Sequence, residues 1–363
     1  MRYKLLIPIF LALLVFTPIS EAFTQIYVRV LVRSGTEFNI EGRSITVNMK
    51  GDTSQIFKDV VSISGKMVPN GVIFAFNLPD MKERDIVIGL NTAIDVLGED
   101  IYINGNPYRG SVRILFRGEK ILVINILPLE DYLYSVVPSE MPYYWPIEAL
   151  KAQAVLARTY TLKALSRNSK KDYDLTDSID SQLYKGKTEE HQSTNEAVDA
   201  TKGEVVLYNN LLAEVFYHST CGGHTEDATN IWNIEKLPYL KGVECNYCTE
   251  SQWKSWQRVI KREDWKNLIG DGDMSIRYDS SGRLMYINGI SGTKVRDVFH
   301  LPSTFIVGIE VKEDRVIING KGNGHGVGLC QWGARGMAER GFNYKEIIAY
   351  YFPGVTVDAY RGF

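Results

Sequence analysis

The chain has no long apolar run after its first 22 residues, no block of basic residues, no internal repeat and no low-complexity segment. A membrane helix needs about 20 apolar residues, so we expect no bilayer span beyond the N-terminus. A formal net charge of −2 without a basic patch argues against nucleic acid as the main partner. The H-E-x-x-H pattern is also absent, which argues against a zinc peptidase or amidase with an open catalytic metal site.

The N-terminus is the one segment with an export signature. Met1-Arg2-Tyr3-Lys4 is basic, residues 5–16 are apolar, and Ser20-Glu21-Ala22 supplies small residues at a cleavage position. This pattern predicts a signal peptide over residues 1–22, cleaved after Ala22. The alternative is an uncleaved N-terminal membrane anchor. Either outcome places the rest of the chain outside the cytoplasm, in the cell envelope or secreted.

Residues 23–104 predict a β-rich N-terminal region. Ile26, Val28, Val30 and Val32 alternate with polar or larger side chains, which is the period of a half-buried strand. Similar short runs recur to about residue 127, separated by turn signals such as Asn104-Gly105. Together with the helical patterns that follow, they predict an α+β fold, with a helical core flanked by β-rich parts that form the walls of a groove.

Two helices are expected after this region, from Pro128 to about Val137 and from Pro146 to about Arg167. The tight connection between them contains prolines and one carboxylate, Glu140. A rigid connection of this kind suits a catalytic group. Glu130 and Asp131 are expected to be charges at the start of the first helix.

The last segment, from 321 on, is expected to fold back onto the core. It opens with a glycine-rich loop at 322–328. A helix is expected after this loop, opened by Asn343 with Glu346 three residues on in a capping-box pattern.

The aromatic residues after Glu140 give that carboxylate a chemical interest. Tyr143, Tyr144 and Trp145 provide apolar surroundings, which raise the pKa of a carboxyl group, and flat faces that suit sugars. A general acid needs such a raised pKa to hold its proton near neutral pH. The alternative is a helix-capping or ion-paired carboxylate.

Three of the four cysteines form a spaced cluster with a histidine. Cys221-x₂-His224 is followed, after twenty residues, by Cys245-x₂-Cys248. This spacing predicts a closed, structural Zn²⁺ site, with His218 as a substitute ligand. Because exported thiols tend to oxidise, a disulfide from Cys245 to Cys221 or Cys248 is the alternative. Cys330 is expected to be a small buried residue.

Several motifs together resemble the stage II sporulation protein D (SpoIID/LytB) family. They follow the family's order over residues 105–356, which we take as its catalytic domain, with the Cys/His cluster at 218–248. The motifs are Tyr108-Arg109-Gly110, Leu129-Glu130-Asp131-Tyr132-Leu133, Ser139-Glu140-Met141-Pro142, the segment 145–154, Ala157-Arg158-Thr159-Tyr160, Ser181-Gln182-Leu183-Tyr184, the segment 220–225 and the segment 324–334.

The resemblance implies a lytic transglycosylase that cuts peptidoglycan glycan strands, some family members acting on strands stripped of peptides. It implies that Glu140 is the acid/base and that Arg158 matters for activity, although a structural tie to a core carboxylate is an equal reading of Arg158. Other members are described as amidase enhancers, so a cell-wall amidase is a second expected partner.

Polar and aromatic residues of the matching motifs are candidates for a substrate groove. Taken singly, each such residue is more often structural. They are Ser139, Tyr143, Gln153, Tyr160, Gln182, Tyr184, His325, Gln331 and Trp332.

Overall fold

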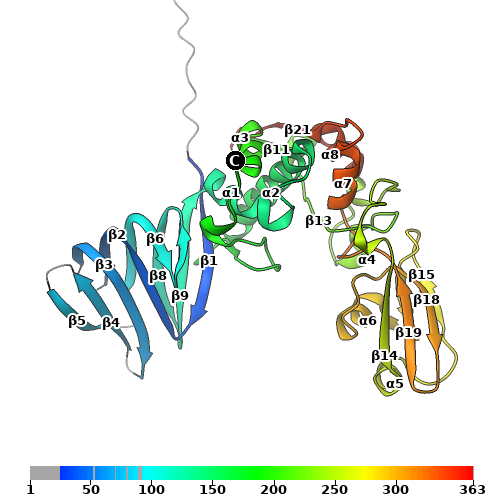
Figure 1. Cartoon of the computed structure of the whole chain (residues 1–363), viewed down its shortest axis with the longest axis horizontal. Coiled ribbons are helices and arrows are strands. Elements are labelled where there is room, and N and C mark those ends of the chain that lie inside the picture. The colour runs from blue at the N-terminus through cyan, green and yellow to red at the C-terminus, as the bar shows by residue number, and fades with distance from the viewer. Residues whose placement is uncertain (1–24, 52–53, 70, 79–80, 89–91, 363) are drawn as a thin grey trace, which may run out of the picture.

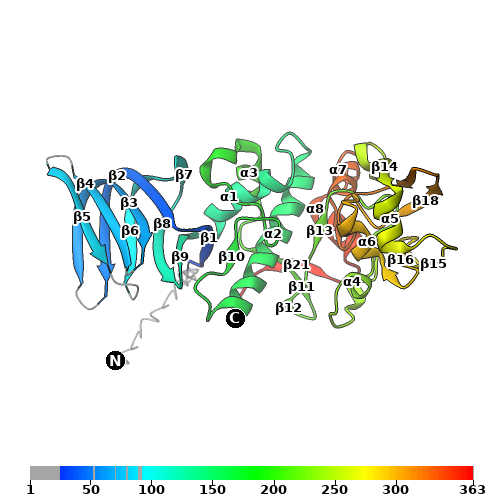
Figure 2. The same ribbon diagram turned by 90° about the horizontal axis from the view of Figure 1, so that it is seen from below.

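The computed structural model describes residues 25–51, 54–69, 71–78, 81–88 and 92–362, so the expected signal segment 1–22 lies outside it. A β-sheet forms one end of the elongated molecule, helices form the middle, and a second β-containing unit forms the other end (Figures 1 and 2). The predicted α+β class is confirmed. Among the residues that the structure describes, none of the helices combines the length and hydropathy that a bilayer crossing requires.

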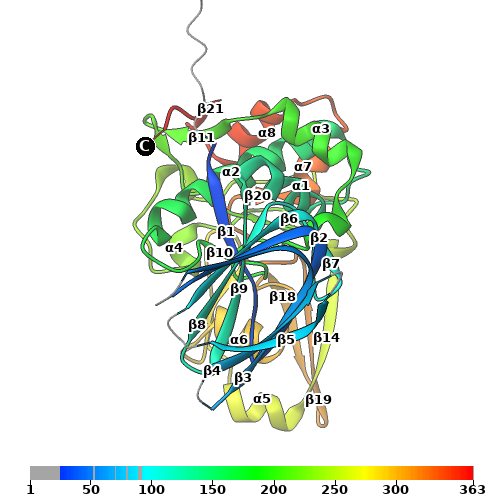
Figure 3. The same cartoon turned by 90° about the vertical axis from the view of Figure 1, so that its left-hand side faces the viewer.

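A ten-stranded sheet makes up the N-terminal end, in the order β10-β1-β9-β8-β6-β2-β3-β4-β5, with β7 paired to β6. Figure 3 looks onto this end and shows its strands fanning out through a strong twist. The strands are β1 (Tyr27–Gly35), β2 (Glu37–Lys50), β3 (Gln55–Val68), β4 (Gly71–Leu78), β5 (Met81–Ile88), β6 (Ala93–Ile103), β7 (Asn106–Tyr108), β8 (Ser111–Arg117), β9 (Lys120–Pro128) and β10 (Leu175–Thr176).

The alternation at the start of the chain places Val28 and Val30 in the core of the sheet. Strand β3 was not expected from the sequence. The pairing of β2 with β3 shifts register near Ile45, and Asp59 has a φ of 57°, so the period-2 pattern is interrupted there. The sheet also continues past residue 104, because β8 pairs with β6 and β9 pairs with β1.

The helical middle is built around α2, most of whose side chains are buried. α7 and α8 pack against α2, so the chain's last segment folds back onto the middle as expected. The predicted capping box of α8, made by Asn343 and Glu346, is confirmed. The helices are α1 (Leu129–Glu140), α2 (Ile147–Asn168), α3 (Gln192–Ala200), α4 (Ala228–Ile231), α7 (Gln331–Ala338) and α8 (Tyr344–Tyr351), with 3₁₀ turns η1 (Gly186–Glu189), η2 (Pro238–Leu240) and η3 (Gln252–Lys254).

Short strands connect this middle part. β11 lies between β12 and β21, and β13 pairs in parallel with β20, which places Tyr217 opposite Leu329 and His218 opposite Cys330. Their bounds are β11 (Glu204–Tyr208), β12 (Leu211–Leu212), β13 (Tyr217–His218), β20 (Leu329–Cys330) and β21 (Thr356–Ala359).

Residues 256–320 form the second β-containing unit, around a core that includes Trp265, Ile287 and Val316. Its strands make two three-stranded sheets, β14-β19-β18 and β15-β16-β17. The elements are β14 (Trp256–Lys261), α5 (Arg262–Ile269), β15 (Ile276–Tyr278), β16 (Leu284–Ile287), β17 (Ile290–Ser291), α6 (Gly292–Val298), β18 (Ile306–Val311) and β19 (Arg315–Gly320).

Candidate active site

Glu140 is the last residue of α1 rather than a residue of the connection after it. The helix continues through Pro138, beyond the end predicted near Val137, and Met141 then takes an extended conformation. A proline this close to a helix end removes only one N–H from the final turn, so the helix can include it. The expected connection is thereby shortened to the loop between Glu140 and Ile147.

The side chain of Glu140 is partly buried. It faces the loop that follows β10, where the N–H of Leu183 donates to its Oε1 at 2.9 Å. Burial raises the pKa of this carboxyl group above its ordinary value. Hydrogen bonds from the Leu183 N–H and the Tyr217 hydroxyl oppose the rise by stabilising the carboxylate. The carboxyl group therefore keeps its proton to higher pH than an exposed glutamate does.

Gln182 is a buried polar residue, next in sequence to Leu183, whose side chain makes several hydrogen bonds. The hydroxyl groups of Tyr132 and Thr161 both lie within hydrogen-bonding distance of its Oε1, at 3.3 and 2.8 Å, which orients its Nε2 toward the Tyr217 hydroxyl at 3.2 Å. Since the Tyr217 oxygen accepts from Gln182, its own proton is free to be donated to Glu140. Gln182 thus acts on the carboxylate through Tyr217.

His325 holds the other side of Tyr217. Its Nδ1 accepts from the Val327 N–H at 3.1 Å, which leaves Nε2 to donate to the carbonyl oxygen of Tyr217 at 3.0 Å. Burial lowers the pKa of His325 to about 4, so the ring is neutral near pH 7. Both ring nitrogens are used within the protein, and His325 supports the position of Tyr217.

Three further predicted residues lie close to Glu140. Gln331, at the start of α7, donates from Nε2 to the Glu140 carbonyl oxygen at 3.0 Å and to Gln153 Oε1 at 3.2 Å. Gln153 is fully buried on α2. Tyr160 lies near enough for the Glu140 charge to contribute, after burial, to a raised Tyr160 pKa.

Arg158 is placed elsewhere, in a buried ion pair with Glu130. Its Nε and Nη2 donate to the two carboxylate oxygens at 2.9 and 2.7 Å. Its other contacts are the carbonyl oxygens of Val198 and Glu204 and the Thr201 hydroxyl. Within the described part of the chain, no hydrogen bond or ion pair joins it to Glu140. This geometry favours the structural reading of Arg158, and it corrects the view of Glu130 as only a helix-start charge.

Four other candidates have separate surroundings. The Ser139 hydroxyl donates to the Ser135 carbonyl oxygen, and the buried Tyr184 donates to Asn125 Oδ1 at 2.6 Å. Tyr143 is exposed and stacks on His191, with ring centroids 3.7 Å apart. Trp332 packs edge-on against Trp145. Of these, Tyr143 has the open aromatic face that a sugar could contact.

The structure gathers four buried cysteines, and this changes the expected ligand set at one position. The sulfurs of Cys221, Cys245, Cys248 and Cys330 lie within 4.8 Å of one another. His224 is not in this group, and its Nδ1 instead lies 2.6 Å from the Thr225 carbonyl oxygen. The parallel pairing of β13 with β20 brings Cys330 to the cluster, a contact between segments about a hundred residues apart.

The sulfur geometry fits a tetrahedral metal ion. Zn–S bonds of about 2.3 Å place neighbouring sulfurs about 3.8 Å apart. The Cys221 and Cys248 sulfurs are separated by 3.6 Å, and all four cysteines are free thiols. His218, the substitute ligand considered from the sequence, turns its Nδ1 to the Val327 carbonyl oxygen. Four thiolates could hold Zn²⁺ and leave no position for a reactive water.

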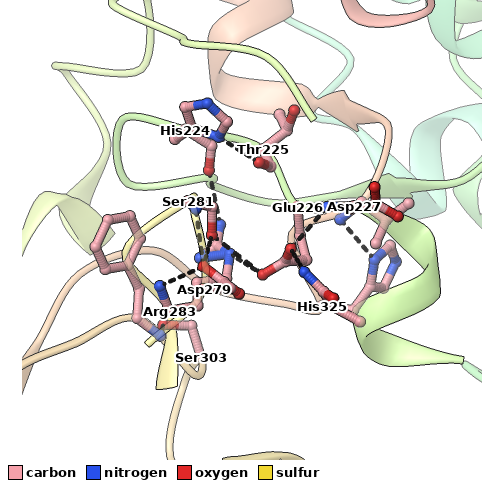
Figure 4. Close-up of polar contacts among 12 residues, drawn as sticks. His224, Thr225, Glu226, Asp227, Asp279, Ser281, Arg283, Ser303 and His325 are labelled. Atoms are coloured by element: carbon pink, nitrogen blue, oxygen red, sulfur yellow. Dashed lines mark hydrogen bonds and ion pairs between the residues drawn. The ribbon is translucent and has the colours of Figure 1, made fainter. Parts of the chain in front are cut away.

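Arg283 ties the second β-containing unit to the cysteine loop. Its Nη2 donates to the carbonyl oxygens of Cys221 and His224 at 2.7 and 2.9 Å, and its Nε lies 3.5 Å from Glu226 Oε2 (Figure 4). Burial and the neighbouring Asp279 raise the pKa of Glu226 to about 7. The buried network fixes the loop that carries Cys221 and the loop that carries His325.

Tyr217 and Cys330 are the two residues that the sequence reasoning missed. Tyr217 lies four residues before Cys221, in a stretch without a recognisable catalytic pattern, so only its contact with Glu140 reveals it. Cys330 could have been found by counting: it is the one remaining cysteine, and it lies beside the glycine-rich loop.

Comparisons with known proteins agree with the motif pattern. Residues 117–208 match the family model described as "SpoIID: Stage II sporulation protein". The chain is 32% identical to an uncharacterised protein of Brachyspira hyodysenteriae over 87% of this chain and 90% of that protein. It is 31% identical to the stage II sporulation protein D of Bacillus subtilis, over 64% and 74% of the two chains. It is also 28% identical to the amidase enhancer of Bacillus subtilis, over 63% of this chain and 40% of that protein.

Proposed function

The chain belongs to the stage II sporulation protein D family, and from this premise we propose that it is a lytic transglycosylase of the cell wall. It would cut peptidoglycan glycan strands, stripped of their peptides, between N-acetylmuramic acid and N-acetylglucosamine. The observation that carries the proposal is Glu140: a partly buried carboxyl group with a raised pKa, oriented by Leu183 and Tyr217.

One carboxyl group is enough for this reaction. A hydrolase of glycosides normally uses two, one as the acid and one as base or nucleophile. Here Glu140 donates its proton to the glycosidic oxygen as the bond from that oxygen to C1 of the muramic sugar breaks. The C6 hydroxyl of the same sugar then bonds to C1, and the resulting Glu140 carboxylate takes the hydroxyl proton. The product is a 1,6-anhydro ring, and water is not consumed.

The tethered nucleophile makes a second activated group unnecessary. An oriented intramolecular group can act at an effective concentration on the order of 10⁵ M or more. The protein's tasks are then to hold the proton donor and the sugar. The hydrogen bonds from Leu183 and Tyr217 serve the first task, because they keep Glu140 in one orientation and stabilise it after it has given up its proton.

We propose that the four cysteines bind a structural Zn²⁺. The short distances among four buried sulfurs support this over a disulfide. The ion would join the loop at Cys221 to the segment at Cys245 and Cys248 and to the start of α7, and it would take no part in cleavage. The expected export signal at 1–22 would place this site in the cell envelope.

A second candidate function is a non-catalytic glycan-binding role that enhances a cell-wall amidase. The similarity to the Bacillus subtilis amidase enhancer favours it. The two functions differ in what they require of Glu140, because glycan binding and partner contact do not need an acid of raised pKa.

Product analysis on peptide-free glycan strands separates these functions. The wild type is expected to release anhydro-ended fragments, Glu140→Gln to fold and release none, and Glu189→Gln, a change at a carboxylate ion-paired with Lys185, to act as the wild type does. Reducing muramic ends in the products, or cleavage retained by Glu140→Gln, would remove the assignment. Enhanced amidase activity without any glycan cleavage would favour the second candidate.

A further inference from the structure

A surface hollow lies where the second β-containing unit meets η3 and the glycine-rich loop. The hollow has a volume of about 410 Å³ and includes Trp253, Arg258, Arg296, Asp297 and Asn323 in its lining. This volume lies within the range of about 300–1,000 Å³ that is usual for small-molecule sites.

Two arginines of this lining form no ion pair among the residues that the structure describes. Within the described part of the chain, neither Arg258 nor Arg296 belongs to an ion pair, although most other arginines do. The Arg296 Nε is buried and has no hydrogen-bond acceptor. Asp297 lies near Arg296 and is the one acidic residue of the lining. A guanidinium group that forms no ion pair within the protein can pair with the carboxylate of a ligand.

The hollow also offers an aromatic face. Trp253, on η3, is partly buried, and its carbonyl oxygen accepts from the Gly322 N–H at 2.8 Å. An indole ring beside guanidinium groups is the combination that suits a sugar bearing a carboxylate, because the ring packs on the apolar face of the sugar and the planar guanidinium pairs with the acid.

Short contacts connect the hollow to Glu140. Asn323 is bonded through its backbone to Thr220, and two residues later His325 donates to the Tyr217 carbonyl oxygen. The hydroxyl of Tyr217 in turn contacts Glu140. Arg296 is close enough to His325 to contribute, after burial, to its lowered pKa. The hollow is therefore linked to the candidate active site through Asn323, His325 and Tyr217.

We infer that this hollow binds the free lactyl carboxylate of a muramic acid residue in a glycan strand, with Arg258 and Arg296 as the carboxylate-binding residues and Trp253 under the sugar. The inference rests on the proposed function, since it names what distinguishes that function's substrate. A stem peptide converts the lactyl carboxylate to an amide, which removes its charge and adds bulk. The hollow thus gives a physical basis for preferring peptide-free strands.

The test measures binding by proteins that also carry Glu140→Gln, so that no strand is cut. The ligands are peptide-free glycan strands, the same strands with their carboxylates reduced to alcohols, and N-acetylglucosamine oligomers. Arg258→Gln is expected to weaken binding of the peptide-free strands about tenfold or more, and to leave binding of the other two ligands unchanged. Arg296→Lys, which keeps the charge but not the planar fork, is expected to lose less than Arg296→Gln.

Arg315→Gln is the matched control, because Arg315 lies at the other end of β19 from the glycine-rich loop. It is expected to bind all three ligands as the parent does. Equal losses on all three ligands, or no loss with Arg258→Gln and Arg296→Gln in protein whose thermal unfolding is unchanged, would overturn the inference. If either result is found while the wild type still releases anhydro products, only the proposed carboxylate site in the hollow is refuted. Carboxylate-dependent binding without any anhydro product refutes only the proposed function.

Discussion

The side-chain amide of Gln331 donates a hydrogen bond of 3.0 Å to the carbonyl oxygen of Glu140, across 191 positions of the chain. The bond joins the start of α7 to the end of α1. Because that carbonyl belongs to the last residue of α1, it has no partner further along the helix. The C-terminal segment therefore completes the end of the helix that carries the proposed acid.

Replacing Gln331 tests this contact directly. Gln331→Leu fills a similar volume but removes the donor to Glu140 and to Gln153. We expect a loss of about 1–3 kcal/mol in unfolding free energy, measured by denaturant titration, and reduced glycan cleavage in the fraction that remains folded. Gln192→Leu, which removes a bond to Glu196 on the surface of α3, is the control. Equal effects of the two changes would contradict the assigned role.

Tyr217→Phe tests the control of the Glu140 pKa. The Tyr217 hydroxyl stabilises the carboxylate and so lowers its pKa, while burial raises it. Removing the hydroxyl raises the pKa of Glu140 further. Since the reaction needs the protonated acid, cleavage falls as pH rises through this pKa, and the alkaline limb of the pH–rate profile is expected to move to higher pH.

The matched control for that profile is Tyr184→Phe. Tyr184 is also a buried tyrosine, but its hydroxyl donates to Asn125 instead of contacting Glu140. It is expected to lower stability without moving the alkaline limb. A limb that moves to lower pH in Tyr217→Phe would show that the hydroxyl does not stabilise the carboxylate.

Arg158 is expected to act through stability. Arg158→Met leaves the partly exposed Glu130 carboxylate without its partner and removes the donors to the Val198 and Glu204 carbonyl oxygens, which is expected to cost about 1–3 kcal/mol. Thermal unfolding should show this loss. Folded Arg158→Met, stabilised at low temperature, should keep the pH–rate profile of the wild type. A changed profile in folded protein would instead support the catalytic role that the family resemblance implied.

The cysteine cluster gives a pair of opposite predictions. Cys330→Ser removes a proposed zinc ligand but keeps an acceptor for the Gly333 N–H at the start of α7. We expect purified Cys330→Ser to lose most of its bound zinc, measured by elemental analysis, and to unfold at lower temperature. His224→Ala should keep its zinc, because His224 lies outside the cluster. The reverse result would restore the ligand set expected from spacing.

Local sequence patterns predicted many elements correctly because their causes are local. The alternation at Val28 and Val30 sets a strand, and Asn343 with Glu346 sets the start of α8. The same reasoning failed where the pairing of strands or the end of a helix departed from the local rule. It missed β3 because the register shift near Ile45 breaks the alternation, and it ended α1 too early because it treated Pro138 as a stop.

The sequence alone pointed to Glu140 as a candidate acid and to the cysteine motif as a candidate metal site, because a carboxylate among prolines and aromatics, and closely spaced cysteines, carry their chemistry in neighbouring residues. Only the tertiary structure decided which groups surround them. Tyr217 meets Glu140, Cys330 replaces His224 and Arg158 meets Glu130 through pairings of segments distant in the chain. Such pairings depend on how strands and helices pack to bury apolar surface, and no spacing along the chain records them.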